Sequence, residues 1–135
     1  MKKLTIDFET RSKEDLKKAG AWKYSRHEST DILCICWKLD EGETFYWSPF
    51  METNFDDFYD MAYLKDLFAL ATRDDVLIEA HNAQFEYCIW HNVGAKKYNF
   101  PTLPLEKFFC SAARAAALAL PRNLEDVGRA LGASV

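Results

Sequence analysis

The chain has 135 residues, of which 49% are hydrophobic and 15% aromatic, which is enough apolar material for the core of one compact domain. Its formal net charge of −4 argues against a module whose main task is tight nonspecific binding of a polyphosphate, so any contact with nucleic acid must be local or metal-mediated. The sequence contains no apolar run near the length of a membrane span and begins without a signal-peptide stretch. These features predict an intracellular, cytoplasmic protein with no membrane partner.

The first half of the chain predicts an antiparallel meander. Strands are expected over residues 4–9, 32–37 and 44–47. Residues 4–9 alternate strictly between apolar and polar, whereas 32–37 form a continuous apolar run, which predicts a strand buried on both faces. A hairpin turn is expected at 40–43. A short helix over 13–19 should end at Gly20, which stands where helices commonly stop.

The second half predicts helices that alternate with a buried strand. The expected segments are an acidic loop over 49–60, a helix bearing the apolar positions of 61–71, a strand over 76–78, a helix that starts after Asn82, an alanine-rich helix over 106–120, and a short helix capped by Asn123 and stopped by Gly132. This alternation points to a parallel strand added to the meander. The predicted class is therefore α/β, with a mixed sheet flanked by helices.

The cysteines Cys34, Cys36, Cys88 and Cys110 follow neither a disulfide pattern nor a C-x-x-C zinc spacing. Free buried thiols are the simplest interpretation. A zinc site built from Cys88, His91 and the Cys34/Cys36 pair is an alternative, because Cys88 and His91 stand three residues apart on an expected helix. Closed zinc sites usually contain tight ligand pairs, which favours the free thiols.

One stretch, residues 11–31, leans basic and also contains Trp22 and Tyr24. Basic groups interleaved with aromatic rings suit a nucleic-acid single strand, because its backbone needs cations and its bases need stacking surfaces. The alternative is a solvated helix and loop face with Trp22 in the core, and composition alone favours that interpretation at least as much.

Two acidic positions have the pattern of a metal site. Asp7 and Glu9 are two apart on a predicted strand, so both side chains project from the same face and could hold one divalent ion. Phosphodiester hydrolysis by two metal ions needs several such carboxylates in one pocket. A solvent-facing polar edge of an amphipathic strand would give the same spacing, and spacing alone favours that interpretation.

A second group of polar residues lies where the predicted strand 76–78 gives way to a helix. Asn82 and Glu86 are four apart and share one helix face, and ligand sites in α/β sheets gather at the carboxyl ends of strands. Asn82 as an ordinary N-cap and Glu86 as a solvated helix carboxylate are the alternatives. Two acidic sites that both fall at expected sheet ends favour a functional role.

Asp7-Phe8-Glu9-Thr10 resembles the first motif of the DEDD 3′→5′ exonuclease superfamily, and residues 81–86, His-Asn-Ala-Gln-Phe-Glu, resemble its second motif. The match is closest to the proofreading domains of phage-type family A DNA polymerases and covers nearly the whole chain. The resemblance implies a ribonuclease-H-like fold and metal-dependent removal of nucleotides from the single-stranded 3′ end of DNA. It also implies a polymerase domain in the same longer polypeptide, acting in a bacterial or phage-infected cell.

The resemblance also implies roles for individual residues. Asp7 would bridge two divalent ions, Mg²⁺ or Mn²⁺, Glu9 would complete the shell of one ion, and Glu86 would hold the second. Substrate positioning would fall to three further residues, Thr10, Asn82 and Phe85. For His81, a place at the start of the helix, satisfied by backbone groups, is the more plausible interpretation than a direct role.

The third motif of that superfamily, a Tyr or His four residues before a final Asp, has no counterpart, because no Tyr or His follows Tyr98. Glu125 and Asp126 more simply serve the first turn of the last helix. We therefore expect residues 1–135 to form one exonuclease domain that lacks its C-terminal catalytic helix and is feeble alone. An RNA-trimming exonuclease, a degenerate domain and a noncatalytic nucleic-acid-binding or interaction domain remain as alternatives.

Overall fold

The computed structural model describes residues 1–50 and 57–133 and contains a five-stranded mixed sheet. The strands are β1 (Lys2–Arg11), β2 (Asp31–Leu39), β3 (Thr44–Trp47), β4 (Val76–Ala80) and β5 (Phe108–Cys110), and they lie in the order β3-β2-β1-β4-β5. β1 pairs antiparallel with β2 and parallel with β4, and β4 pairs parallel with β5. The predicted meander with an added parallel strand is confirmed.

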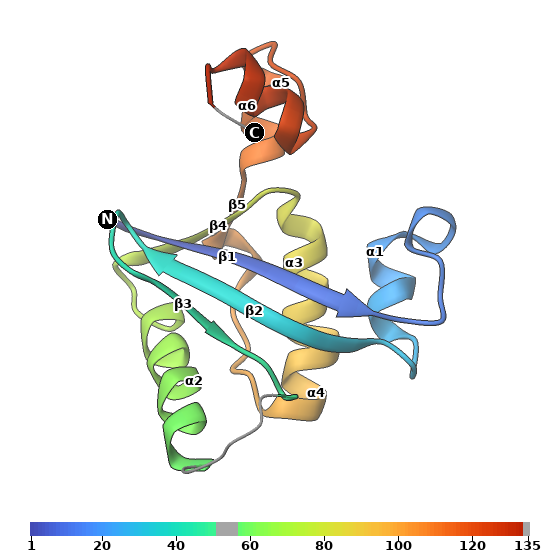
Figure 1. The fold of residues 1–135 in the computed structure, drawn as a ribbon, viewed down its shortest axis with the longest axis vertical. Coiled ribbons are helices and arrows are strands. Elements are labelled where there is room, and N and C mark those ends of the chain that lie inside the picture. The colour runs from blue at the N-terminus through green and yellow to red at the C-terminus, as the bar shows by residue number, and fades with distance from the viewer. Residues whose placement is uncertain (51–56, 134–135) are drawn as a thin grey trace.

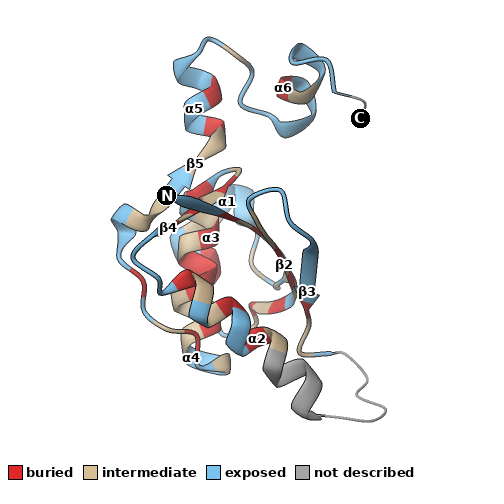
Figure 2. Cartoon of the chain, turned by 90° about the vertical axis from the view of Figure 1, so that its left-hand side faces the viewer, coloured by how far each residue is buried: buried red, intermediate tan, exposed pale blue. Residues whose placement is uncertain are grey.

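Helices flank this sheet, which confirms the predicted α/β class. They are α1 (Leu16–Arg26), α2 (Asp57–Ala71), α3 (Ala83–Ile89), the π-helix η1 (Trp90–Gly94), α4 (Ala95–Tyr98), the 3₁₀ helix η2 (Leu105–Lys107), α5 (Ser111–Ala117) and α6 (Leu124–Ala130). In Figure 1, α2 and α3 lie behind the sheet, whereas α1 stands beside the carboxyl end of β1. α5 and α6 form a separate arm above the sheet (Figures 1 and 2). Within the described residues, no helix combines the length and apolarity needed to cross a membrane.

An aromatic cluster fills the space between the sheet and its helices. The ring centroid of Phe100 lies 4.8 Å from that of Trp90 and 4.9 Å from that of Phe68. Phe8 of β1 contacts both Trp90 and Phe100. The indole of Trp90 is fully buried and donates a hydrogen bond to the Pro101 carbonyl at 2.7 Å, so burial leaves its polar group satisfied. This cluster fixes β1 relative to η1, which directly follows α3.

Gly94 allows the closest approach in this cluster. A Cβ at this position would stand 2.7 Å from the ring of Phe100. We expect Gly94→Ala to lower the free energy of unfolding by about 1–3 kcal/mol, because overpacking forces the ring or the helix to shift. Urea unfolding followed by tryptophan fluorescence measures this loss. If the clash is the cause, Gly94→Ala combined with Phe100→Leu costs less than the two single losses together, and additive losses would contradict it.

Four predicted segments differ from the structure. The first is the strand at 32–37, which is buried on one face only, because Cys34 and Cys36 are half-buried and Leu33 is exposed. The apolar run suggested two covered faces, but α2 and α3 both pack on the face that carries Ile35 and Trp37. Only Cys88 of the four cysteines is buried, and all four are free.

The second difference concerns the helix predicted over residues 13–19. The helix begins at Leu16, after Asp15 has capped the amides of Lys17 and Lys18, and it continues to Arg26. Gly20, with φ of 81° and ψ of 165°, is non-helical and ends the first helical segment of α1, so the predicted stop is confirmed. The predicted start near Lys13 was wrong, and the second helical segment, in which Tyr24 and Ser25 are buried, was not predicted.

The third difference is the alanine-rich helix predicted over 106–120. Residues 108–110 instead form β5, and α5 spans only Ser111–Ala117. Phe108 packs edge-on against Tyr87, so a tertiary contact overrides the local helix preference. The prediction of an acidic loop over 49–60 is also wrong from Asp57 onward, because α2 begins there. Residues 51–56 of that predicted loop lie outside the described residues.

Candidate active site

Asp7 and Glu9 are exposed on the face of β1 opposite the helices. Their strand partners are Cys36 and Cys34 of β2, so the two carboxylates and the two thiols occupy the same face of the sheet. A groove of about 260 Å³ lies along this face and includes Asp7, Cys36 and Lys38 in its lining. The sequence prediction that both carboxylates share one face is therefore confirmed.

Glu86 reaches the same part of β1 from α3. Its side chain is only 3% exposed, and its Oε2 accepts a hydrogen bond from the Phe8 amide at 3.1 Å. β4 ends at Ala80, so this amide lies past the last residue pair between β1 and β4. The carboxyl group of Glu86 takes the place that a strand carbonyl would otherwise fill. The interpretation of Glu86 as a solvated helix carboxylate is wrong.

The environment of Glu86 disfavours its charged form. Burial is the largest cause, the negative charges of Asp7 and Glu9 add to it, and the Phe8 amide opposes it. Together they raise the pKa of Glu86 to about 8. The same neighbourhood acts on the Cys36 thiol, whose pKa is raised by burial and then by Cys34 and Asp7. Electrostatic contact between Glu86 and Asp7 thus links the two predicted motifs.

The donors on this face are hard carboxylate oxygens, which are the ligands that Mg²⁺ and Mn²⁺ prefer. Among the residues that the structure describes, no group of three or more His, Cys, Asp or Glu side chains is placed to hold one ion. The exposed pair Asp7 and Glu9 nevertheless fits a magnesium-type ion, which is commonly bound through one or two carboxylates and keeps several waters. Glu86 is turned toward the Phe8 amide.

Tyr24 joins two of the predicted substrate-binding residues. Its hydroxyl shares a hydrogen bond of 2.8 Å with the hydroxyl of Thr10, and its ring lies 6.1 Å from that of Phe85. The pairing of β1 with β2 shifts its register between Glu9 and Thr10. In the sequence Tyr24 stands out only as part of the basic stretch, and nothing local predicts that it contacts Thr10.

Asn82 and His81 occupy the connection between β4 and α3. Asn82 has φ of 74° and is exposed, and within the described chain its side chain makes no capping hydrogen bond, so the ordinary N-cap interpretation is wrong. His81 Nδ1 shares a hydrogen bond with the Ser111 hydroxyl at 2.9 Å, and its Nε2 contacts the Arg122 carbonyl. His81 therefore ties the start of α3 to the C-terminal arm, in line with its structural interpretation.

The alternative zinc site does not form in the described part of the chain. His91 Nδ1 donates to the Tyr87 carbonyl at 2.9 Å, and His91 Nε2 accepts from the Leu103 amide at 3.0 Å. Both ring nitrogens are thus engaged in backbone hydrogen bonds. Cys88 is buried, and no three-ligand group occurs among the described residues.

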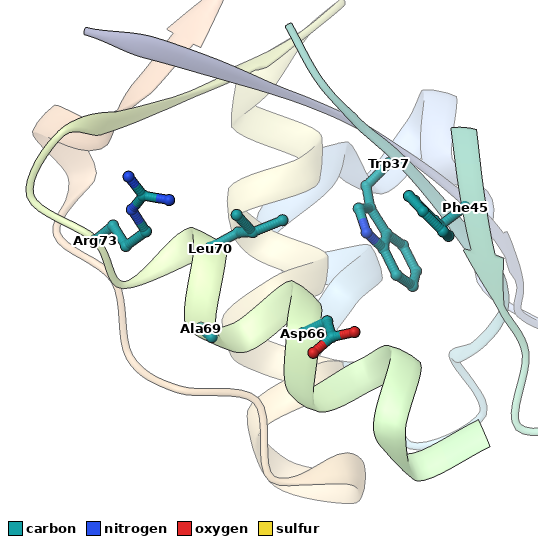
Figure 3. Close-up of a pocket in the computed structure, with 6 residues that line it drawn as sticks. All are labelled: Trp37, Phe45, Asp66, Ala69, Leu70 and Arg73. Carbon is teal, nitrogen blue, oxygen red and sulfur yellow. The ribbon is translucent and has the colours of Figure 1, made fainter. Parts of the chain in front are cut away.

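A larger pocket, of about 350 Å³, lies on the other side of the sheet (Figure 3). Trp37 and Phe45 form one wall with stacked rings, and α2 contributes Leu70 and Arg73 to the opposite wall. Trp37 pairs with Ile6, whose side chain faces the core, so this pocket opens on the helix-covered side, away from Asp7. The carboxylate site does not include it.

The raised pKa of Glu86 predicts a pH-dependent stability. Between about pH 5 and pH 8 the folded state holds a proton on Glu86 that the unfolded state has released, so this contribution to stability declines as the pH rises through that window. We expect Glu86→Gln to remove the decline, because the amide keeps a carbonyl acceptor for Phe8 and cannot ionise. Relative to this variant, the wild type should lose up to about 1.4 kcal/mol per pH unit.

Urea unfolding at several pH values in the presence of EDTA measures the difference. Glu106→Gln is the matched control, because Glu106 is exposed in η2, and it should follow the wild-type pH dependence. If the wild type and Glu86→Gln lose stability in parallel as the pH rises, burial does not raise the pKa of Glu86.

The chain is similar in sequence to a phage DNA polymerase. The chain fits no protein-family model. It is 33% identical over 136 residues to the DNA polymerase of Bacillus phage SP02. The match covers 97% of this chain and 18% of that polymerase, so the chain spans less than a fifth of the relative's length.

Proposed function

We propose that the chain is a metal-dependent 3′→5′ exonuclease domain of the DEDD superfamily, with a ribonuclease-H-like fold, and that it works within a DNA polymerase. The observation that carries the proposal is the convergence at β1, where Asp7 and Glu9 flank the amide that Glu86 engages from α3. Acidic side chains from two separate motifs thus meet at one strand. The five-stranded mixed sheet and the similarity to a phage DNA polymerase support it.

Two divalent ions, Mg²⁺ or Mn²⁺, would supply the Lewis acidity and the activated water that phosphodiester hydrolysis needs. Asp7 and Glu9 would hold them from the open face of the sheet, where both carboxylates reach solvent. Glu86 would contribute once it loses its proton, which the positive charge of a neighbouring ion favours. The Phe8 amide positions that carboxyl group beside Asp7 and Glu9 before any ion binds.

The residues around the carboxylates would hold the end of the substrate. Thr10 and Phe85, both half-buried, form a polar and aromatic surface next to Glu9, and the buried Tyr24 connects them. Such a surface suits a terminal nucleotide, because the ring of Phe85 can contact a base while hydroxyl groups meet the sugar and phosphate. Asn82 projects from an exposed left-handed turn and could contact the same nucleotide.

The biological role of this activity would be proofreading during DNA synthesis. The phage relative is a DNA polymerase more than five times as long as the match, which suggests a polymerase domain in the same polypeptide. The substrate would be the single-stranded 3′ end of DNA that such a polymerase extends. DNA is preferred over RNA on the strength of that relative, and digestion of matched DNA and RNA strands in parallel would distinguish them.

Asp7→Ala should abolish metal-dependent trimming of a 3′ end by the full polypeptide, because the exposed pair loses one of its two carboxylates. The measurement is the release of nucleotides from a 5′-labelled DNA strand with Mg²⁺ or Mn²⁺. Asp74→Ala is the matched control, since Asp74 is exposed and lies before β4, near the amino end of β1. Unchanged trimming by Asp7→Ala would rule out this site.

Ion binding can be followed without any catalysis. Manganese should raise the melting temperature of the wild type and of Asp74→Ala, because an ion that binds only the folded state stabilises it. The same titration should leave Asp7→Ala nearly unchanged. An equal rise for all three proteins would contradict a carboxylate metal site and favour a noncatalytic domain.

A further inference from the structure

α1 has an exposed outer face with a charge opposite to that of the whole chain. The helix contains four basic residues, Lys17, Lys18, Lys23 and Arg26, and none that is acidic, whereas the chain carries a net charge of −4. All four are exposed. α1 is thus locally positive, which is the arrangement that a net acidic protein needs to contact a polyanion.

Trp22 stands in the middle of this basic face and is 55% exposed. The interpretation that buries Trp22 in the core is therefore wrong. The guanidinium of Arg26 lies over its ring, 5.3 Å from the centroid. An exposed indole offers a large aromatic face to a ligand beside these cations. Lys23 and Arg26 in the last turn also complement the helix dipole, but the dipole does not account for the exposed ring.

Trp22 lines a shallow hollow of about 480 Å³. Its lining consists of Glu14, Trp22, Lys23, Arg26 and His27. An aromatic platform with cations beside it suits an unpaired base and its phosphate, because every base has a face that can stack and every phosphate attracts Lys or Arg. The cations alone would attract a duplex as well, but the platform does not suit one, because the bases of a duplex stack on each other.

The inner face of α1 connects this surface to the candidate active site. Tyr24, two residues after Trp22, is buried, and its hydroxyl shares a hydrogen bond with that of Thr10 at the end of β1. Asn92 donates a hydrogen bond of 2.9 Å to Ser25, which holds the same turn against η1. Figure 1 shows α1 beside the arrowhead of β1. The platform is therefore held rigidly next to the strand that carries Asp7 and Glu9.

We propose that the outer face of α1 binds single-stranded DNA, with a base stacked on Trp22 and phosphates neutralised by Lys23 and Arg26. The proposal rests on the proposed exonuclease function, since it gives the strand that enters the carboxylate site a path across α1. It names the part of the substrate that lies outside the site, several nucleotides before the bond to be cut. DNA is specified because the similar phage protein is a DNA polymerase.

The test measures the anisotropy of a short fluorescein-labelled DNA single strand in EDTA, so that neither ion binding nor cleavage contributes. Trp22→Ala should weaken binding about 5- to 100-fold, the usual effect of removing one stacking aromatic. Trp22→Phe should retain most of the affinity, because the smaller ring still stacks. Phe109→Ala is the matched control, an exposed aromatic on β5, and should bind like the wild type.

Charge is tested separately through salt dependence. Replacing Lys23 and Arg26 by Gln should reduce the slope of log affinity against log salt by about 1.4, since a single strand loses about 0.7 per phosphate contact. Lys65→Gln, at an exposed position on α2, should leave the slope unchanged. Circular dichroism of each variant shows whether it is folded.

Four results would overturn the proposal: unchanged binding by Trp22→Ala, equal losses for Trp22→Phe and Trp22→Ala, equal losses on a blunt duplex, or tighter binding of the matching RNA strand. The two proposals can fail separately, because strand binding is measured in EDTA and trimming is measured with Mg²⁺ or Mn²⁺. If the wild type fails to trim DNA but shows binding that depends on Trp22, the exonuclease proposal fails and the surface remains supported.

Discussion

The hydrogen bond from the Phe8 amide to the Glu86 carboxyl group links the two halves of the structure. β4 stops pairing with β1 before Phe8, so an amide in the middle of the sheet would lack a partner if α3 did not supply one. A glutamine could accept the same bond without the cost of burying an ionisable group. An acid at this position, beside Asp7 and Glu9, is unfavourable for stability and is best explained by a function that needs its charge.

Unequal covering of the sheet creates the site. The aromatic cluster around Phe100 and Trp90 supplies the packing on one face, with α2 and α3 against it. The other face is left with Asp7 and Glu9 in solvent, paired across the strands with Cys36 and Cys34. Stability and chemistry therefore use alternate residues of the same strand. A change in the register of β1 by one residue would bury both carboxylates, so the sheet would lose its apolar packing and the site its exposed acids.

Local patterns predicted the elements that local physics determines. The alternation in residues 4–9, the turn at 40–43 and the Asn123 cap all depend on near neighbours, and each is confirmed. β5 was missed because its three residues become a strand only through pairing with β4. For the site, spacing predicted that Asp7 and Glu9 share a face. It could not predict the burial of Glu86, because the partner amide is 78 positions away in sequence.

The distribution of charge follows from the chemistry of an acidic site. If the proposed function holds, Asp7, Glu9 and Glu86 would make the end of β1 repel a polyanionic strand, and bound cations and nearby basic groups would both offset that repulsion. A uniformly basic chain would bind duplex everywhere, whereas a net acidic chain with a basic helix beside the site would attract a strand there. The aromatic ring on that helix adds a preference for unpaired bases, which electrostatics alone cannot provide. The negative net charge would thus provide selectivity, and the local positive charge of α1 would provide attraction.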